Sequence, residues 1–173
     1  VIDAYQTGND AIAAINALGE GAGQAFRNVN QHILCVSKFL LHYSAATSFS
    51  WVSKLFACTG TPGSNGKPTG AALATSDQHA GSELSTTPQW ITHTFATPYT
   101  LAANTNYCIV IDMTAHTSGN LIDNYDSTDP THAGNFCYEL AYLWFSSSTA
   151  DNLFEINEET SKIPLFQHSY RAR

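Results

Sequence analysis

Residues 33–43, ILCVSKFLLHY, and residues 106–113, NYCIVIDM, decide the fold of this 173-residue chain. Both runs are almost continuously apolar, and the first has no helix-capping residues. They are rich in the β-branched, aliphatic and aromatic side chains that favour buried strands. The two runs therefore predict long strands inside an all-β structure.

Similar patterns recur on either side of these runs. Strands are predicted at 49–58, 71–77, 89–95, 120–125, 136–145 and 152–157. Turn chemistry separates them: Ser-Ala-Ala-Thr at 44–47, a Gly- and Pro-rich loop at 59–70, and Pro98, which is expected to end the strand at 89–95. No helices alternate with these strands, so an antiparallel two-sheet sandwich is expected.

Two segments need separate treatment. Residues 10–18, DAIAAINAL, favour a short helix capped by Asp10 on local pattern, although a strand is the alternative. In residues 136–145, FCYELAYLWF, aromatic and aliphatic side chains alternate, which predicts one strand with these residues on one face.

The composition restricts the classes of function. Hydrophobic residues make up 43% of the chain, charged residues only 12%, and the net charge is −7. Binding to nucleic acid needs a basic surface, so it is not expected. An anionic membrane would repel this chain, and no apolar stretch is long enough for a membrane-spanning helix.

Several short motifs resemble a known family. They are Gly-Gln-Ala-Phe at 23–26, Lys-Pro-Thr-Gly-Ala-Ala-Leu-Ala-Thr-Ser-Asp at 67–77, Phe-Ala-Thr-Pro-Tyr-Thr-Leu at 95–101, the run 106–111, and the loop that ends in Ser-Thr-Asp-Pro-Thr-His-Ala-Gly-Asn at 127–135. As a set, these motifs resemble a family of jelly-roll β-sandwich modules found in phage and virus structural proteins and in bacterial surface proteins. The resemblance covers roughly residues 3–157 and implies a role in adhesion, decoration or scaffolding. Asn104 replaces a glycine that is common in the family, and asparagine also tolerates a positive φ.

The resemblance does not extend to the C-terminal residues, so two units are expected: a jelly-roll domain at 1–159 and an extended arm at 160–173. The arm contains Lys162, Arg171 and Arg173 and no acidic residue, whereas the rest of the chain is acidic. Pro164 disfavours a helix there. Such an arm could add as a strand to the sheet edge of a neighbouring copy. The residues expected to anchor it are Ile163, Leu165, Phe166, Tyr170, Arg171 and Arg173. A simple solvated tail is the alternative.

Three further groups of residues are candidates for chemistry. Asp123, Asp126 and Asp129 supply oxygen atoms in a loop and could bind Ca²⁺, although Asx turns explain the same residues. Trp51 and Trp90 could stack on a glycan, or they could be core residues. The four cysteines Cys35, Cys58, Cys108 and Cys137 have no zinc-like spacing, which favours small buried side chains over one or two disulfides.

No catalytic motif is present in the sequence. The seven histidines lie outside HExxH and GxSxG frames, and no pair of acids can be placed at working distance from sequence alone. The expected function is therefore non-catalytic. We expect a structural protein on a virion surface, in capsid decoration or in a tail or fibre, that binds other copies of itself or other virion proteins. The alternative is a carbohydrate-binding or adhesive module of a secreted or cell-surface protein.

Overall fold

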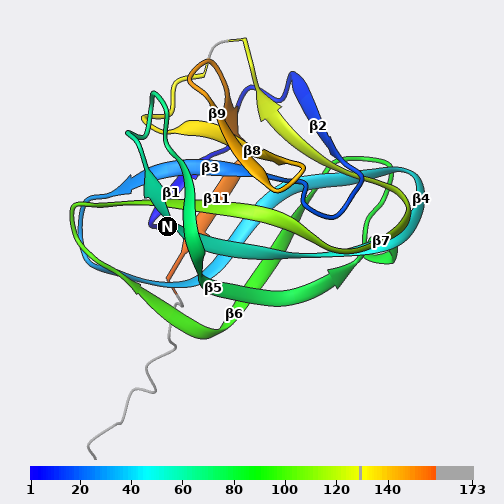
Figure 1. Ribbon diagram of the computed structural model, residues 1–173, viewed down its shortest axis with the longest axis horizontal. Coiled ribbons are helices and arrows are strands. Elements are labelled where there is room, and N and C mark those ends of the chain that lie inside the picture. The colour runs from blue at the N-terminus through cyan, green and yellow to red at the C-terminus, as the bar shows by residue number, and fades with distance from the viewer. Residues whose placement is uncertain (129, 159–173) are drawn as a thin grey trace, which may run out of the picture.

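The apolar runs 33–43 and 106–113 lie within two very long strands, β4 (His32–Thr59) and β7 (Thr105–Asp126). These strands pair with each other antiparallel, from Ala57 opposite Tyr107 to Leu41 opposite Asp123. Figure 1 shows this two-stranded ribbon crossing the molecule and bending round at one end. Six other strands pair directly with β4 or β7, so this ribbon organises the whole fold.

The computed structural model describes residues 1–128 and 130–158. Its other strands are β1 (Asp3–Tyr5), β2 (Ala11–Ile15), β3 (Gly21–Asn28), β5 (Lys67–Ala80), β6 (Gln89–Leu101), β8 (Asn135–Leu140), β9 (Leu143–Ser147), β10 (Asp151–Asn152) and β11 (Phe154–Asn157). A 3-10 turn, η1 (Gly81–Glu83), follows β5. No α-helix occurs in the described part of the chain, and so no helix there could span a membrane.

All the pairings are antiparallel and form one continuous sheet that does not close on itself. Its main path runs β1-β11-β4-β7-β3-β8-β9. The first part of β4 lies between β11 and β6, whereas its last part lies between β7 and β5. The expectation of an all-β, antiparallel fold is therefore confirmed.

The main core is built from alternate residues of the long strands. Its largest fully buried side chains include Trp51, Phe26, Phe39, Phe95 and Phe154. Each such residue contributes about 1.5–3 kcal/mol by leaving water. A smaller cluster of buried residues, around Ala25, Phe56, Cys108, Val110 and Cys137, is separate from this core.

Three predicted breaks in the strands do not occur, and the first is between the strands predicted at 106–113 and 120–125, which are both part of β7. Residues 44–47 were expected to form a turn, but β4 continues through them, and its pairing with β7 is irregular there, with Ala45 at φ 69°. The prediction that Pro98 ends a strand is also wrong, because β6 continues to Leu101. The pairing of β6 with β4 is interrupted between Thr94 and Tyr99, so Pro98, which has no N–H, falls where no ladder bond is needed.

The predicted single strand at 136–145 is in fact a hairpin. β8 and β9 are joined by Ala141 and Tyr142, both at positive φ (51° and 65°), with Leu140 directly opposite Leu143. Two-residue hairpin turns with two positive φ values usually contain Asn or Gly, and neither is present here. The helix favoured locally at 10–18 is also absent, because β2 takes the alternative strand conformation and pairs with β7.

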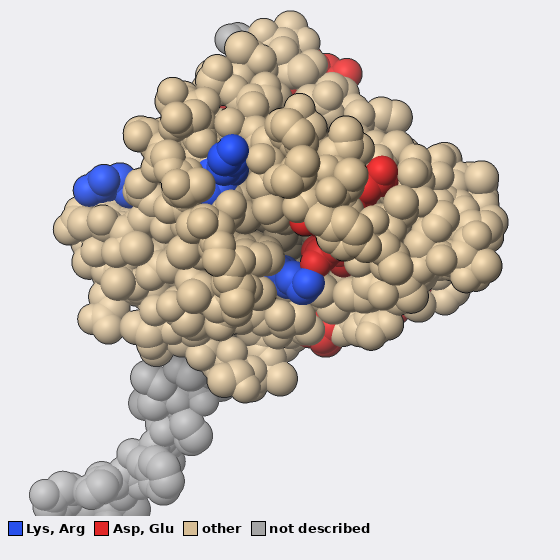
Figure 2. Space-filling model, in the orientation of Figure 1, with Lys and Arg blue, Asp and Glu red and all other residues tan. Residues whose placement is uncertain are grey.

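The surface carries few charges, as the composition suggested. Figure 2 shows scattered Lys, Arg, Asp and Glu side chains on an otherwise uncharged face. The boundary expected at residue 159 and the arm residues Ile163, Leu165, Phe166, Tyr170, Arg171 and Arg173 lie outside the described residues.

Asn104 gives a first testable prediction. It has φ 55° in the turn before β7, and its backbone N–H donates to the Val29 carbonyl. Replacing Asn104 by glycine should leave the free energy of unfolding within about 0.5 kcal/mol of wild type. Alanine should lower it by about 1 kcal/mol, because its Cβ disfavours a left-handed backbone. Urea denaturation of the two variants checks this, and equal stability of both would contradict it.

Candidate functional site

The hairpin of β8 and β9 lies at one end of the sheet's main path and exposes many apolar side chains. We call residues 135–147 the edge hairpin. β8 pairs with β3 on one side and with β9 on the other, and β9 ends the path. The exposed apolar side chains of this hairpin are Tyr138, Leu140, Tyr142, Leu143 and Phe145, and Tyr142 is 71% exposed. Apolar residues gathered at a sheet edge mark a surface for association.

The tip of the edge hairpin is held against the body of the protein. The Tyr142 N–H donates to the Gly19 carbonyl at 3.0 Å. The Tyr142 ring covers Gly19 so closely that a Cβ at that glycine would lie 2.8 Å from the ring carbons. Gly19 also has φ +76°, which favours glycine. This contact fixes the tip, so a partner would meet a largely preformed surface.

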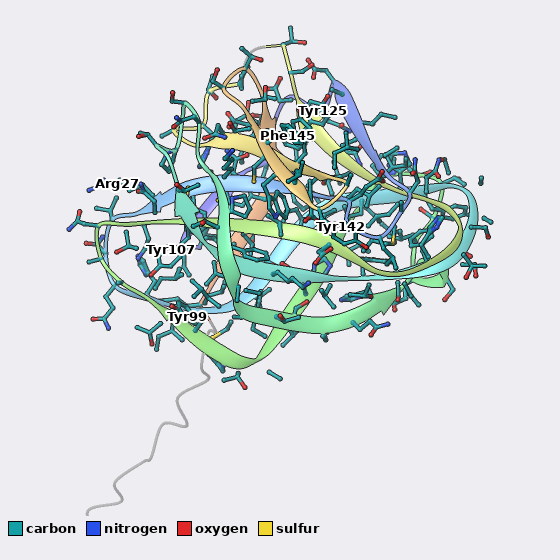
Figure 3. All side chains as sticks on the ribbon, in the orientation of Figure 1. Arg27, Tyr99, Tyr107, Tyr125, Tyr142 and Phe145 are labelled. Atoms are coloured by element: carbon teal, nitrogen blue, oxygen red, sulfur yellow. The ribbon has the colours of Figure 1, made fainter. Side chains whose placement is uncertain are left out.

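Four aromatic rings stack in a row from β7 across the edge hairpin. Tyr125 stacks on Phe136, Phe136 on Tyr138, and Tyr138 on Phe145, with centroid distances of 4.6, 5.9 and 5.4 Å and interplanar angles between 20° and 24°. Figure 3 labels the two ends of this aromatic column, Tyr125 and Phe145, together with Tyr142. Because the inner rings cover one another's faces, the column stiffens the hairpin.

A cavity of about 460 Å³ lies beside the aromatic column. Its walls include Tyr125, Phe136 and Tyr138 together with Glu20 and Glu139. The pKa of Glu139 is raised, first by burial and then by the nearby charge of Asp112. Apolar walls with a few acceptor groups are typical of small-ligand sites.

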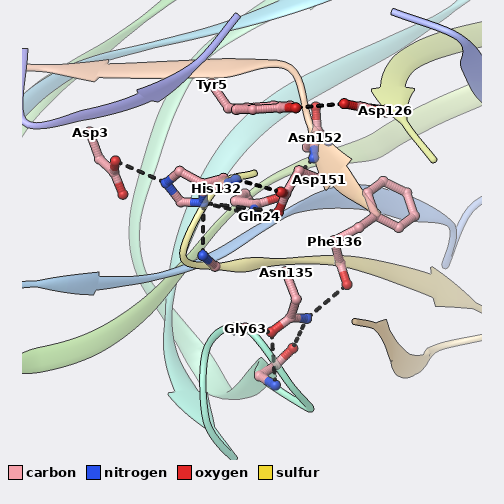
Figure 4. A network of polar contacts seen from close by, with 12 residues as sticks. Asp3, Tyr5, Gln24, Gly63, Asp126, His132, Asn135, Phe136, Asp151 and Asn152 are labelled. Atoms are coloured by element: carbon pink, nitrogen blue, oxygen red, sulfur yellow. Dashed lines mark hydrogen bonds and ion pairs between the residues drawn. The ribbon is translucent and has the colours of Figure 1, made fainter. Parts of the chain in front are cut away.

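A buried polar network links β1, β3, β10 and the 132–135 loop (Figure 4). His132 Nδ1 accepts hydrogen bonds from the Gly134 N–H (2.9 Å) and from Gln24 Nε2 (3.0 Å). These two donors assign the ring proton to Nε2, which donates to Asp3 Oδ1 at 3.0 Å. Both nitrogens of His132 are therefore engaged in holding the loop in place.

Gln24 is the central member of this network. Its Nε2 also donates to Asp151 Oδ1 at 2.7 Å, and its Oε1 accepts from the Asn152 N–H at 2.8 Å. Asp151 Oδ2 accepts from the His132 N–H, and burial raises the pKa of Asp151. One fully buried amide thus connects three backbone segments that are distant in sequence.

A second buried acid lies next to this network. Asn152 Nδ2 donates to Asp123 Oδ2 at 2.6 Å. The other oxygen of each side chain, Asp123 Oδ1 and Asn152 Oδ1, is buried and has no hydrogen-bond partner. Burial raises the pKa of Asp123 well above its usual range. A protonated Asp123 carboxyl group would supply one O–H donor. The two buried oxygens, Asp123 Oδ1 and Asn152 Oδ1, lack such a donor.

The predicted calcium ligands are only partly brought together. Asp123 pairs with Asn152, and Asp126 accepts from the Tyr5 hydroxyl at 2.5 Å and from the Thr128 N–H. Asp129 lies outside the described residues. Within residues 1–128 and 130–158, no three His, Cys, Asp or Glu side chains are grouped to hold a metal ion. The calcium site stays a prediction.

The two tryptophans proposed as glycan contacts differ. Trp51 is fully buried and donates from Nε1 to His93 Nε2 at 2.9 Å, so it is a core residue and offers no ring face to a sugar. Burial and the neighbouring His79 lower the pKa of His93 to about 3, which keeps His93 a neutral acceptor. Trp90 is 39% exposed, and its role as a glycan contact stays a prediction.

Sequence reasoning did not identify the edge hairpin or the polar network. The alternating aromatics at 136–145 were a signal, but without a turn signature they indicated one straight strand. The comparisons add no family: the chain matches no protein-family model, no curated protein and no solved structure.

Proposed function

We propose that this chain is a non-catalytic structural protein that assembles in many copies on a virion surface, as a capsid-decoration, tail or fibre protein. The observation that carries this proposal is the edge hairpin. It combines exposed apolar side chains with β9, the last strand on the sheet's main path. Soluble monomers usually protect such edges with charged residues or proline, and β9 has neither.

The proposal includes a two-sheet jelly roll for the domain. Its support is the change of neighbours along β4, whose first part pairs with β6 and β11 and whose last part pairs with β5 and β7. A long bent strand shared in this way can belong to two packed layers. The family resemblance of the sequence motifs points in the same direction.

The proposed partner is a second copy of this chain. The basic arm expected at 160–173 would pair with β9 of a neighbour, where Glu139 lies nearby in β8. Strand addition would supply backbone hydrogen bonds, and the apolar hairpin residues would bury surface against the arm. The low charge of the body favours close packing between copies.

The test is to place a charge on the free edge. Leu143→Lys should convert assembled protein to monomer, because a lysine on an edge strand opposes pairing with another strand. Because Leu143 is exposed, the free energy of unfolding should change by no more than about 0.5 kcal/mol. The matched control is Val29→Lys, the same kind of change at an exposed site far from the hairpin in the sequence. Light scattering coupled to size exclusion measures the mass.

Three outcomes separate the parts of this proposal. A wild-type chain that is monomeric at high concentration, or a Leu143→Lys variant that assembles as wild type does, would exclude the edge hairpin as the interface. If a chain ending at residue 158 still assembles, the arm is not needed, but the edge hairpin can still be the interface. If Leu143→Lys and Val29→Lys reduce assembly equally, the association of copies is non-specific.

A carbohydrate-binding or adhesive module is the second candidate, and the cavity beside the aromatic column is the observation that favours it. Its volume of about 460 Å³ falls within the range of roughly 300–1,000 Å³ typical of small-ligand sites. Glu20, which also lines this cavity, could accept hydrogen bonds from sugar hydroxyl groups. Glycan-array binding by a monomeric wild-type chain, lost on Tyr138→Ala, would favour this candidate over assembly.

A further inference from the structure

Three of the four cysteines meet on one face of the sheet, outside the main core. They come from three different strands: Cys58 from β4, Cys108 from β7 and Cys137 from β8. Cys108 and Cys137 belong to the smaller buried cluster, and Cys58 packs against that cluster. Distant parts of the sequence therefore bring three thiols together.

The strand register explains why these side chains can touch. Phe56 of β4 is opposite Cys108, so Cys58, two residues further along, is on the same face. β3 lies between β7 and β8, and it places Ala25 opposite Cys108 and Gly23 opposite Cys137. Because these two residues are small, they leave room above β3 for the sulfur atoms.

The Cys108 side chain interacts with that of Cys58 on one side and with that of Cys137 on the other. Cys58 Sγ donates a hydrogen bond to the Thr59 carbonyl at 3.4 Å. Cys35 is not part of this cluster, and its thiol donates instead to the Ile33 carbonyl at 3.7 Å. All four cysteines are free thiols in this structure.

The linked thiols differ in access and in acidity. Cys58 is partly exposed, next to the exposed Thr59 and Gly60, whereas Cys108 and Cys137 are fully buried. Polar interactions with the Cys108 thiol and with the Lys67 backbone lower the pKa of Cys58, despite its partial burial. Burial raises the pKa of Cys108. A partly exposed thiol of lowered pKa beside a buried thiol is the arrangement of an attacking and a resolving cysteine.

We propose that Cys58 and Cys108 form a thiol–disulfide exchange site that reacts with low-molecular-weight disulfides. The Cys58 thiolate attacks one sulfur of the small disulfide, whose S–S bond breaks and releases one small thiolate. The Cys108 thiol then loses its proton, and its sulfur attacks Cys58 in the mixed disulfide and releases the second small thiolate. Two protein thiols are oxidised, the small disulfide is reduced to two thiols, and the two protein protons pass to the released thiolates.

The product would link β4 to β7, the two strands of the central ribbon. A covalent link there closes a long loop of the chain and should raise the melting temperature of the oxidised protein. The site adjoins β9, because Trp144 packs against the same small cluster, but its two reacting residues, Cys58 and Cys108, lie outside the edge hairpin. Its chemistry can therefore succeed or fail independently of assembly.

The test is exposure of the intact, folded chain to oxidised glutathione near neutral pH, followed by intact-mass measurement and non-reducing peptide mapping. Wild type should lose the mass of two hydrogens and give a peptide in which Cys58 is joined to Cys108. Cys108→Ser should stop at a mixed disulfide with one glutathione on Cys58. Cys58→Ser should give neither product, and the matched control Cys35→Ser should behave as wild type.

Other results would overturn the proposal. They are a wild-type chain that stays fully reduced, glutathione found on Cys35 as often as on Cys58, and a crosslink that joins Cys108 to Cys137. Cys137→Ser should keep the Cys58–Cys108 crosslink, so its loss in that variant also counts against the proposal. If Cys108→Ser does not fold, the wild-type peptide map and the Cys58→Ser variant still decide the matter.

Discussion

Replacing Gln24 by glutamate is expected to lower the free energy of unfolding by about 3–5 kcal/mol at neutral pH. The change keeps the shape of the side chain but removes the NH₂ group that donates to Asp151 Oδ1 and His132 Nδ1. It also places a second carboxylate against that of Asp151 at a fully buried position. Both effects disfavour the folded state, since a buried charge without a partner is costly.

The matched control for this change is Gln78→Glu. Gln78 is exposed and makes one side-chain hydrogen bond, to Ser50 Oγ, so the same substitution there should change stability by about 0.5 kcal/mol or less. Denaturant titrations of both variants at neutral and at mildly acidic pH provide the measurement. The loss of unfolding free energy in Gln24→Glu relative to wild type should be smaller at mildly acidic pH, because the new carboxyl group takes up a proton. Equal losses in the two variants would show that Gln24 is not central.

Strand positions were predictable where apolar residues are dense, and much less so where strands change partner. The runs at 33–43 and 106–113 were identified as strands because burial selects their side chains. That β4 continues through 44–47 was not predictable, because Ser-Ala-Ala-Thr is a good turn sequence and only pairing with β7 keeps it extended. Tertiary contacts overrode local preference there.

The candidate sites were harder to predict than the fold. Gln24 lay within a recognised motif, but its partners His132, Asp151 and Asn152 are more than a hundred residues away in the sequence. Only the register of β3 against its neighbours brings them together, and periodicity does not specify register between distant strands. The turn at Ala141 and Tyr142 carries no sequence signature, so the exposed tip of the edge hairpin could not be foreseen.

Asp123→Asn is expected to remove a pH dependence that wild type shows. The pKa of Asp123 is raised in the folded state by burial, whereas in the unfolded chain it is about 3.9. Between these two values the folded protein holds a proton that the unfolded chain has released. The wild-type free energy of unfolding should therefore fall as pH rises through this window, by at most about 1.4 kcal/mol per pH unit from this group.

Asparagine at this position should reproduce the neutral acid without titrating. Its NH₂ group, in place of the unpaired Asp123 Oδ1, can donate to Asn152 Oδ1, while its carbonyl accepts from Asn152 Nδ2, so no oxygen of the pair is left without a partner. The stability of Asp123→Asn relative to wild type should thus increase with pH above about 4. Asp10→Asn is the matched control: hydrogen bonds from Thr128 and Ser127 lower the pKa of Asp10, so the stability of this variant relative to wild type changes only below about pH 4 and stays constant above it. Denaturant titrations across this pH range distinguish the two trends. An Asp123→Asn variant that loses stability relative to wild type as pH rises would mean that Asp123 is ionised in the folded protein.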